Sequence, residues 1–322
     1  MNPDPTISFG DQVRAIPGGE HLDVCFACGT CVSKCMIQQK LEPDYNPRRL
    51  LRMVMLDMRE EAFQSPTTWL CSACDLCYPA CPQEIHISGV IGAVKQLAVE
   101  AGYESPLETV VVDDDLCSGC GICVMVCPYE APSLLEKPID GQPDRVSTVD
   151  ENKCMGCGIC VAACPLGAIS RPGVSNAEVR AQIEIEAGDG APRLIVFVCD
   201  WSLRAVEDVT LLESYPPNVR IVHIPCSGRI DPEMALMALR SGIDGVLVCG
   251  CAPGECHYKR GTDVSACKTE LLNRMLDQMT IGSSTGNGCV RFVQIGTMDR
   301  GRIRNEVDGM LESLEAQEEA SL

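Results

Sequence analysis

Apolar residues in the first part of the chain recur with the spacing of helices. Between Pro47 and Phe63 they fall on one face, and Pro47 suits the first turn of a helix. That face consists of Leu50, Leu51, Val54, Met55 and Met58. A second helix is expected from Ile87 to Ala101. Residues 1–105 are therefore predicted to form a helical module.

The pattern changes after Arg171. Residues 172–192 are predicted to be a linker with a short helix. Over residues 193–322, short runs rich in β-branched residues alternate with helical patterns. The expected strands are Leu194–Val198, Arg220–Ile224, Val246–Val248 and Val290–Ile295, and the expected helices are Asp231–Ser241, Asp263–Met279 and Asp299–Ala316. Such alternation predicts a flavodoxin-like α/β domain with a parallel sheet flanked by helices.

Cysteine is the most informative residue type, with 23 in the chain. Four runs share the spacing C-x2-C-x2-C-x3-C. They are Cys25-Cys28-Cys31-Cys35, Cys71-Cys74-Cys77-Cys81, Cys117-Cys120-Cys123-Cys127 and Cys154-Cys157-Cys160-Cys164. Cysteines this close in sequence cannot pair as unstrained disulfides, and Met1–Gly10 shows no basic region followed by an apolar run. The runs therefore indicate thiolate ligands in a reducing cytoplasm.

The runs fall into two pairs. The third and fourth are an internal duplication, because SGCGIC at 118–123 matches MGCGIC at 155–160. Residues 106–171 are predicted to be a small α+β ferredoxin-like module that holds this pair. The first two runs belong to the helical module. The fold class is thus multidomain, with three modules in series.

Thiolates at i, i+3 and i+6 can bind three irons of one 4Fe–4S cubane. In two-cluster ferredoxins the fourth cysteine of each run ligates the other cluster. This crossover predicts four cubanes, held by Cys25, Cys28, Cys31 and Cys81; by Cys71, Cys74, Cys77 and Cys35; by Cys117, Cys120, Cys123 and Cys164; and by Cys154, Cys157, Cys160 and Cys127. Zinc needs only four ligands, usually as two separated C-x2-C pairs, and suits such runs poorly.

The C-terminal part holds further cysteines at strand ends. Cys199, Cys226 and the pair Cys249 and Cys251 each lie just past the carboxyl end of an expected parallel strand, and Cys256 lies in the following loop. Ligands of open α/β sheets collect at that edge. Four thiolates there suit a 2Fe–2S cluster or a structural zinc.

Three other residues of this region are expected to be structural. Cys267 falls inside an expected helix and Cys289 begins an expected strand, so both are predicted to be small buried hydrophobes. A lone histidine such as His257 is more often structural than a ligand.

Charge and hydropathy restrict the partners. The net charge of −19 argues against nucleic-acid binding, because phosphate would be repelled. It suits docking on basic protein surfaces, and it equally suits solubility alone. The longest apolar run, Leu194–Cys199, is far short of the about 20 residues of a spanning helix, so no membrane insertion is expected.

The chain resembles three known families. Residues 20–101 resemble the C subunit of heterodisulfide reductase, and residues 111–170 resemble a bacterial-type two-cluster ferredoxin. Residues 193–316 resemble the delta subunit of methyl-viologen-reducing hydrogenase. The motifs that carry the last resemblance are IPCSGRIDP at 224–232 and GCAPGECHY at 250–258.

The delta-subunit resemblance implies a 2Fe–2S cluster on Cys199, Cys226, Cys251 and Cys256. It also implies electron transfer from a hydrogenase or formate dehydrogenase to the flavin-containing A subunit of heterodisulfide reductase, where electron bifurcation can occur. Two departures stand out. Ser202 replaces the second cysteine of the family's C-x-x-C, and Cys249 stands where the family has a small residue, so Cys249 and Cys251 remain alternatives.

Three classes of function compete. The favoured one is an electron-transfer subunit of a soluble heterodisulfide-reductase-like complex, with a protein resembling the catalytic B subunit as a further partner. An autonomous reductase is disfavoured, because the chain lacks an adjacent Cys-Cys pair and a G-x-G-x-x-G after a strand; no catalytic residue is assigned. A zinc-stapled adaptor is the third class. An electron relay of a membrane-associated quinone- or cytochrome-linked reductase is a variant of the first class.

Overall fold

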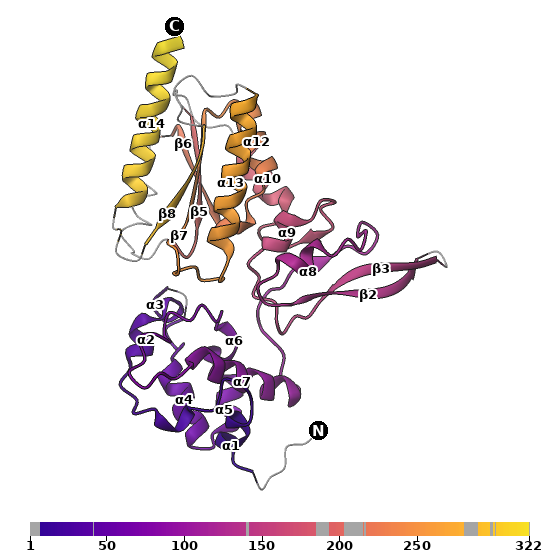
Figure 1. The fold of residues 1–322 in the computed structure, drawn as a ribbon, viewed down its shortest axis with the longest axis vertical. Helices are drawn as coiled ribbons and strands as arrows, with labels where there is room; N and C mark the ends of the chain where they lie inside the picture. Colours follow the sequence, from indigo (N-terminus) through magenta and orange to yellow (C-terminus); the bar gives the residue numbers. More distant parts are fainter. Residues whose placement is uncertain are drawn as a thin grey trace. The chain divides into compact units, whose positions relative to one another are not determined.

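The computed structural model describes residues 7–40, 42–139, 142–184, 193–202, 215, 217–279, 289–296, 299 and 301–321. The chain divides into two compact units, Met1–Leu107 and Glu108–Leu322 (Figure 1). We describe each unit by itself.

The first unit is helical. Its helices are α1 (Phe9–Arg14), a 3₁₀ turn (Leu22–Val24), α2 (Thr30–Lys34), α3 (Met36–Lys40), α4 (Pro47–Met55), α5 (Arg59–Gln64), α6 (Pro66–Leu70) and α7 (Ile87–Glu100). Proline occupies the first position of α4, where Asn46 caps the helix by accepting a hydrogen bond from the Arg49 amide. The expected second helix is confirmed as α7.

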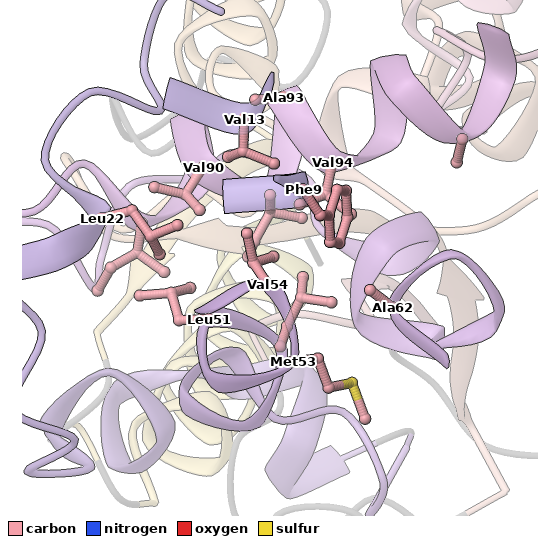
Figure 2. Packing of buried hydrophobic residues seen from close by; sticks show 14 of the residues in the cluster. Phe9, Val13, Leu22, Leu51, Met53, Val54, Ala62, Val90, Ala93 and Val94 are labelled. Atoms are coloured by element: carbon pink, nitrogen blue, oxygen red, sulfur yellow. The ribbon is translucent and has the colours of Figure 1, made fainter. Parts of the chain in front are cut away.

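One apolar core holds these short helices together. Phe9 and Val13 of α1 pack against Leu51 and Val54 of α4 and against α7, and all are buried (Figure 2). The rings of Phe9 and Phe63 meet edge to face, with centroids 5.4 Å apart. Helices this short are not stable alone, so their packing fixes the intervening cysteine loops.

The single helix expected over 47–63 is wrong. Asp57 has a positive φ of 59° and separates α4 from α5. Its Oδ1 accepts a 2.6 Å hydrogen bond from the amide of Phe9, at the start of α1. A contact with a distant segment therefore stabilises a break that the apolar spacing does not show.

The second unit begins with two small antiparallel sheets. β1 (Val111–Val112) pairs with β4 (Ile169–Ser170), and β2 (Pro132–Ile139) pairs with β3 (Gln142–Val149). The short helices α8 (Ile122–Val126) and α9 (Ile159–Ala163) complete this region. Both helices contact each other, so the two duplicated cysteine loops lie side by side.

The rest of this unit contains the expected parallel sheet, which is confirmed. Its strands are β5 (Leu194–Cys199), β6 (Val219–Ile224), β7 (Gly245–Cys251) and β8 (Val290–Ile295), in the order β6-β5-β7-β8. All neighbouring pairs are parallel. After β5 the chain forms β6 on one side of it and then β7 on the other side, so the strand order reverses between β5 and β7. In open parallel sheets, ligands bind outside the carboxyl ends of the strands at such a point.

Helices cover both faces of the sheet. α10 (Asn176–Glu184), α12 (Pro232–Arg240) and α13 (Gly261–Gln278) pack on one face, and α14 (Arg302–Ser321) packs on the other (Figure 1). Expected helices at 231–241, 263–279 and 299–316 correspond to α12, α13 and α14. Part of the expected linker, residues 185–192, lies outside the described residues. Val179 and Ile183 of α10 are buried in the same apolar cluster as β5.

Candidate metal centres

The first unit brings three cysteines of one run together with the last cysteine of the next. Cys25, Cys28, Cys31 and Cys81 line one cavity, with Arg48 and Ile85 among its other walls. Gly29, at a φ of 86°, turns the chain into α2 and so directs Cys31 inward. Burial and the neighbouring Cys25 raise the pKa of the Cys31 thiol to about 11.

The other cysteines of this unit form a second set. Cys71, Cys74 and Cys35 are all electrostatic neighbours of Cys77, whose pKa is raised by burial and by these thiols. Cys31 is also a neighbour of Cys77, so the two sets adjoin. This grouping divides the cysteines of the unit into two sets of four thiols.

Tyr45 is a residue of this candidate site that sequence reasoning missed. It is buried, and its hydroxyl hydrogen-bonds with the sulfurs of both Cys35 and Cys71. These bonds favour the thiolate forms and oppose the effect of burial, which still raises the Cys71 pKa to about 11. No sequence pattern marks this tyrosine, because it belongs to no cysteine run.

The ferredoxin-like region repeats this arrangement. Cys117, Cys120, Cys123 and Cys164 line one cavity. Ser147 of β3 lies beside it, since its amide donates to Cys117 Sγ over 3.4 Å and its hydroxyl lies 3.2 Å from Cys123 Sγ. Such donors stabilise an anionic centre.

The duplicated loop holds the matching set. Cys154, Cys157 and Cys127 are electrostatic neighbours of Cys160, and burial raises the pKa of Cys157 to about 12. Cys123 is also a neighbour of Cys160, which joins this set to its twin. Gly158 precedes α9 at a φ of 79°, as Gly121 precedes α8 at 75°. The two loops therefore have the same local backbone.

The third kind of set lies at the carboxyl edge of the parallel sheet. Cys199 and Cys251 end β5 and β7, Cys226 follows β6, and Cys256 lies between β7 and α13. All four are buried. Their sulfurs form a closed ring of hydrogen bonds, in which Cys199 and Cys256 each contact both Cys226 and Cys251.

Neighbouring cysteines of this ring have pKa values shifted in opposite directions. Hydrogen bonds from Cys226 and Cys251 hold the pKa values of Cys199 and Cys256 well below the ordinary thiol value. The same contacts and burial raise the pKa values of Cys226 and Cys251. Four thiols thus share one buried site, a donor set of the kind that iron–sulfur clusters use.

A cluster of aromatic side chains lies beside this ring, since Tyr258 is an electrostatic neighbour of Cys226. Trp201 and His257 stack with ring centroids 3.3 Å apart, and Tyr258 meets both edge to face. All three are buried. The structure thus places His257 in this aromatic cluster, stacked on Trp201.

The remaining cysteines lie elsewhere. Cys249 is buried among apolar residues on the α14 face of the sheet, with Val307 and Met310, and Cys289 is buried beside β8. The expectation that Cys267 is buried is wrong. It is exposed, because the buried positions of α13, which include Ser265 and Thr269, lie on another face of the helix.

Two other kinds of feature are absent from the part of the chain that the structure describes. It holds no group of three or more His, Cys, Asp or Glu side chains arranged for a single metal ion. Nor does any helix in the described ranges have the length and apolarity needed to cross a membrane.

Family models match the chain in three regions. Residues 194–317 match the methyl-viologen-reducing hydrogenase delta subunit. Residues 21–85 match one 4Fe-4S dicluster domain, and residues 70–131 and 116–168 match another. These matches indicate 4Fe–4S clusters in both the helical and the ferredoxin-like regions.

Curated relatives divide the chain in the same way. The iron-sulfur D subunit of the F420-non-reducing hydrogenase of Archaeoglobus profundus is 40% identical over 92 residues, which are 28% of this chain and 67% of that protein. The A subunit of the ferredoxin:CoB-CoM heterodisulfide reductase of Methanosarcina mazei is 32% identical over 46% of this chain and 19% of its own length. The C subunit of the H2:CoB-CoM heterodisulfide,ferredoxin reductase of Methanothermobacter marburgensis is 30% identical over 32% of this chain and 54% of its own length.

Proposed function

Because this chain belongs to the family of the methyl-viologen-reducing hydrogenase delta subunit, we propose that it relays electrons through four 4Fe–4S clusters and one 2Fe–2S cluster. The chain is an iron–sulfur electron-transfer subunit of the heterodisulfide reductase and hydrogenase type. The observation that carries the proposal is the grouping of its thiols. Two cavities each combine three cysteines of one run with the last of its partner run, and the sheet edge adds a closed ring of four.

The proposed ligands form five sets. Cys25, Cys28 and Cys31 act with Cys81, and Cys71, Cys74 and Cys77 act with Cys35. The ferredoxin-like pair uses Cys117, Cys120, Cys123 and Cys164, and Cys154, Cys157, Cys160 and Cys127. The 2Fe–2S cluster takes Cys199, Cys226, Cys251 and Cys256. Bound clusters supply one-electron storage, and no substrate site of the chain itself is proposed.

The protein's own groups set the conditions for this chemistry. Leu51 and Ile87 at the first cavity, and Leu134 and Ile169 at the second, limit water access. Tyr45 and Ser147 donate hydrogen bonds to sulfur. The two sets of each pair adjoin, so an electron would cross only a short gap between their clusters. Cys31 and Cys77 are neighbours in the helical unit, and Cys123 and Cys160 are neighbours in the ferredoxin-like region.

The proposed partners rest on the relatives' names for the hydrogenase and the A subunit, and on the family resemblance for the formate dehydrogenase, the flavin and the B subunit. A hydrogenase or formate-dehydrogenase-type protein exchanges electrons at the C-terminal site. A flavin-containing protein resembling the heterodisulfide reductase A subunit, where bifurcation would occur, and one resembling the B subunit complete a cytoplasmic complex. The relatives are the A, C and D subunits of such complexes and span only part of this chain. They lend no support to the membrane-associated alternative.

Metal analysis tests the proposal. The anaerobically purified chain should contain about 18 irons with matching sulfide and almost no zinc. Electron paramagnetic resonance of the dithionite-reduced protein should show both cubane and 2Fe–2S signals. An iron content near two with stoichiometric zinc would instead establish the zinc-stapled adaptor.

A further inference from the structure

Arg229 is a fully buried cation, with 0% of its surface exposed. It ends the 3₁₀ turn Ser227–Arg229 that follows β6. Its side chain lies against Gly158 in the second ferredoxin-like loop, where an added Cβ would stand 2.6 Å from Arg229 Cδ. A residue of the α/β region therefore forms part of the surroundings of the Cys154–Cys160 loop.

The charge of this guanidinium is not neutralised by its hydrogen bonds. Nε and Nη2 donate to the carbonyl of Val174 over 3.1 and 2.9 Å, and Nη2 also donates to Asn176 Oδ1 over 2.8 Å. These acceptors are all neutral. Nη1 is buried and has no hydrogen-bond partner among the described residues. A buried donor without a protein acceptor is costly unless an anionic group lies nearby.

The ionisable groups around Arg229 include Asp231, Cys160, Arg171 and Lys268. Burial lowers the pKa of Arg229 to about 10, so the side chain remains positively charged at neutral pH. Asp231 is half-buried and offsets part of the charge. Arg171 adds to it from the other side of the loop, since an added Cβ on Gly156 would stand 3.0 Å from Arg171 Nε.

Among the described residues, no cation stands against Gly121 of the twin loop as Arg229 stands against Gly158. An added Cβ on Gly121, the counterpart of Gly158, would have Leu134 Cδ1 as its near neighbour, at 3.4 Å. At Gly119 the closest atom is the backbone carbonyl of Arg145, whose side chain is exposed. Two loops with nearly the same sequence and backbone thus have different electrostatic surroundings.

We infer that Arg229 raises the reduction potential of the centre held by Cys154, Cys157, Cys160 and Cys127 above that of its twin. This inference rests on the proposed function. Reduction by one electron from a reductant adds one negative charge beside Cys160 and makes or breaks no bond. A fixed buried cation stabilises that added charge more than solvent-screened cations do.

The position of this centre gives the difference a role. Cys157 is an electrostatic neighbour of Cys226 in the C-terminal ring, and Tyr129 and Tyr258 are near both thiols. An electron in the ferredoxin-like region is therefore held preferentially at the centre next to the C-terminal site. Arg229 thus sets the order in which the two centres fill.

A redox titration of the full-length, iron-loaded chain, monitored by electron paramagnetic resonance, tests this role. Arg229→Met should shift one 4Fe–4S transition to lower potential while iron content stays at the wild-type value. Arg229→Lys should largely restore the wild-type potential. Arg180→Met, which removes an exposed cation of the same unit paired with Glu233, should leave every transition in place.

A second variant, which adds a cation instead of removing one, keeps the test decisive if Arg229→Met loses a cluster. Leu134→Lys places a cation beside the twin loop and should raise one 4Fe–4S transition. Unchanged potentials in Arg229→Met with full iron, or in Leu134→Lys, would overturn the inference and leave the proposed function intact. A wild-type chain without cubane signals would instead overturn the proposed function.

Discussion

Gly261 lies directly against the sulfur of Cys226: a Cβ atom added to Gly261 would stand 2.0 Å from Cys226 Sγ. Gly261 begins α13 and is buried, so the sulfur has no free space on that side. Gly261→Ala should therefore displace Cys226 and disrupt the C-terminal ring. We expect loss of about two irons and of the 2Fe–2S signal, with the cubane signals retained.

A matched control is available in the same unit. Gly309 lies in α14, and an added Cβ there would meet no atom within 4 Å. Gly309→Ala should keep all the iron and stabilise the helix by up to about 1 kcal/mol. Retention of the 2Fe–2S signal in Gly261→Ala would show that Cys226 is not a ligand.

The two cysteines of β7 should behave differently on substitution. Cys251 belongs to the hydrogen-bonded ring, whereas Cys249 packs among apolar residues against α14. Cys251→Ser should lose the 2Fe–2S signal, as should Cys226→Ser and Cys256→Ser. Cys249→Ser should keep it and lose only stability, because it buries a hydroxyl in an apolar site. The reverse result, read by iron analysis and paramagnetic resonance, would make Cys249 the ligand.

Removal of the Tyr45 hydroxyl should change one centre of the helical unit. Tyr45→Phe deletes the hydrogen bonds to Cys35 and Cys71. Hydrogen bonds to sulfur stabilise the more anionic reduced state, so one 4Fe–4S transition should move to lower potential with iron content unchanged. The free energy of unfolding should fall by about 1 kcal/mol.

Tyr103→Phe provides the comparison for this tyrosine. Tyr103 packs against Phe63, with centroids 5.3 Å apart, in the same unit. Its substitution should leave all potentials unchanged. If wild type and Tyr45→Phe had the same reduction potentials, the role assigned to Tyr45 would be refuted.

The helical unit should fold and load alone. Its apolar core, from Phe9 to Ala98, and both of its cysteine sets lie within Met1–Leu107. A polypeptide of residues 1–107 should bind about eight irons. Ending it before α7 removes buried residues such as Val90, Ile91 and Val94, so that shorter piece should neither fold nor hold iron. Fewer than about four irons on the 1–107 polypeptide would contradict this division.

Local patterns were sufficient for part of the fold. Strands β5, β6, β7 and β8 and the helix α7 follow from runs of apolar residues, because their periods are local properties. The break at Asp57 could not be foreseen, since a hydrogen bond from Phe9, far away in sequence, stabilises it. The exposure of Cys267 depends on which face of α13 meets the sheet, and that is set by packing.

The candidate sites divide in the same manner. The sequence by itself determined the four cysteine runs, their small intervening residues and the cysteines at strand ends, because ligand spacing along a loop is written into the chain. Only the tertiary structure decided what surrounds each set: Tyr45 beside Cys35 and Cys71, Gly261 behind Cys226, and Arg229 against Gly158 but Leu134 near Gly121. These neighbours come from distant segments, and the burial and charge that they impose exist only once the chain has packed.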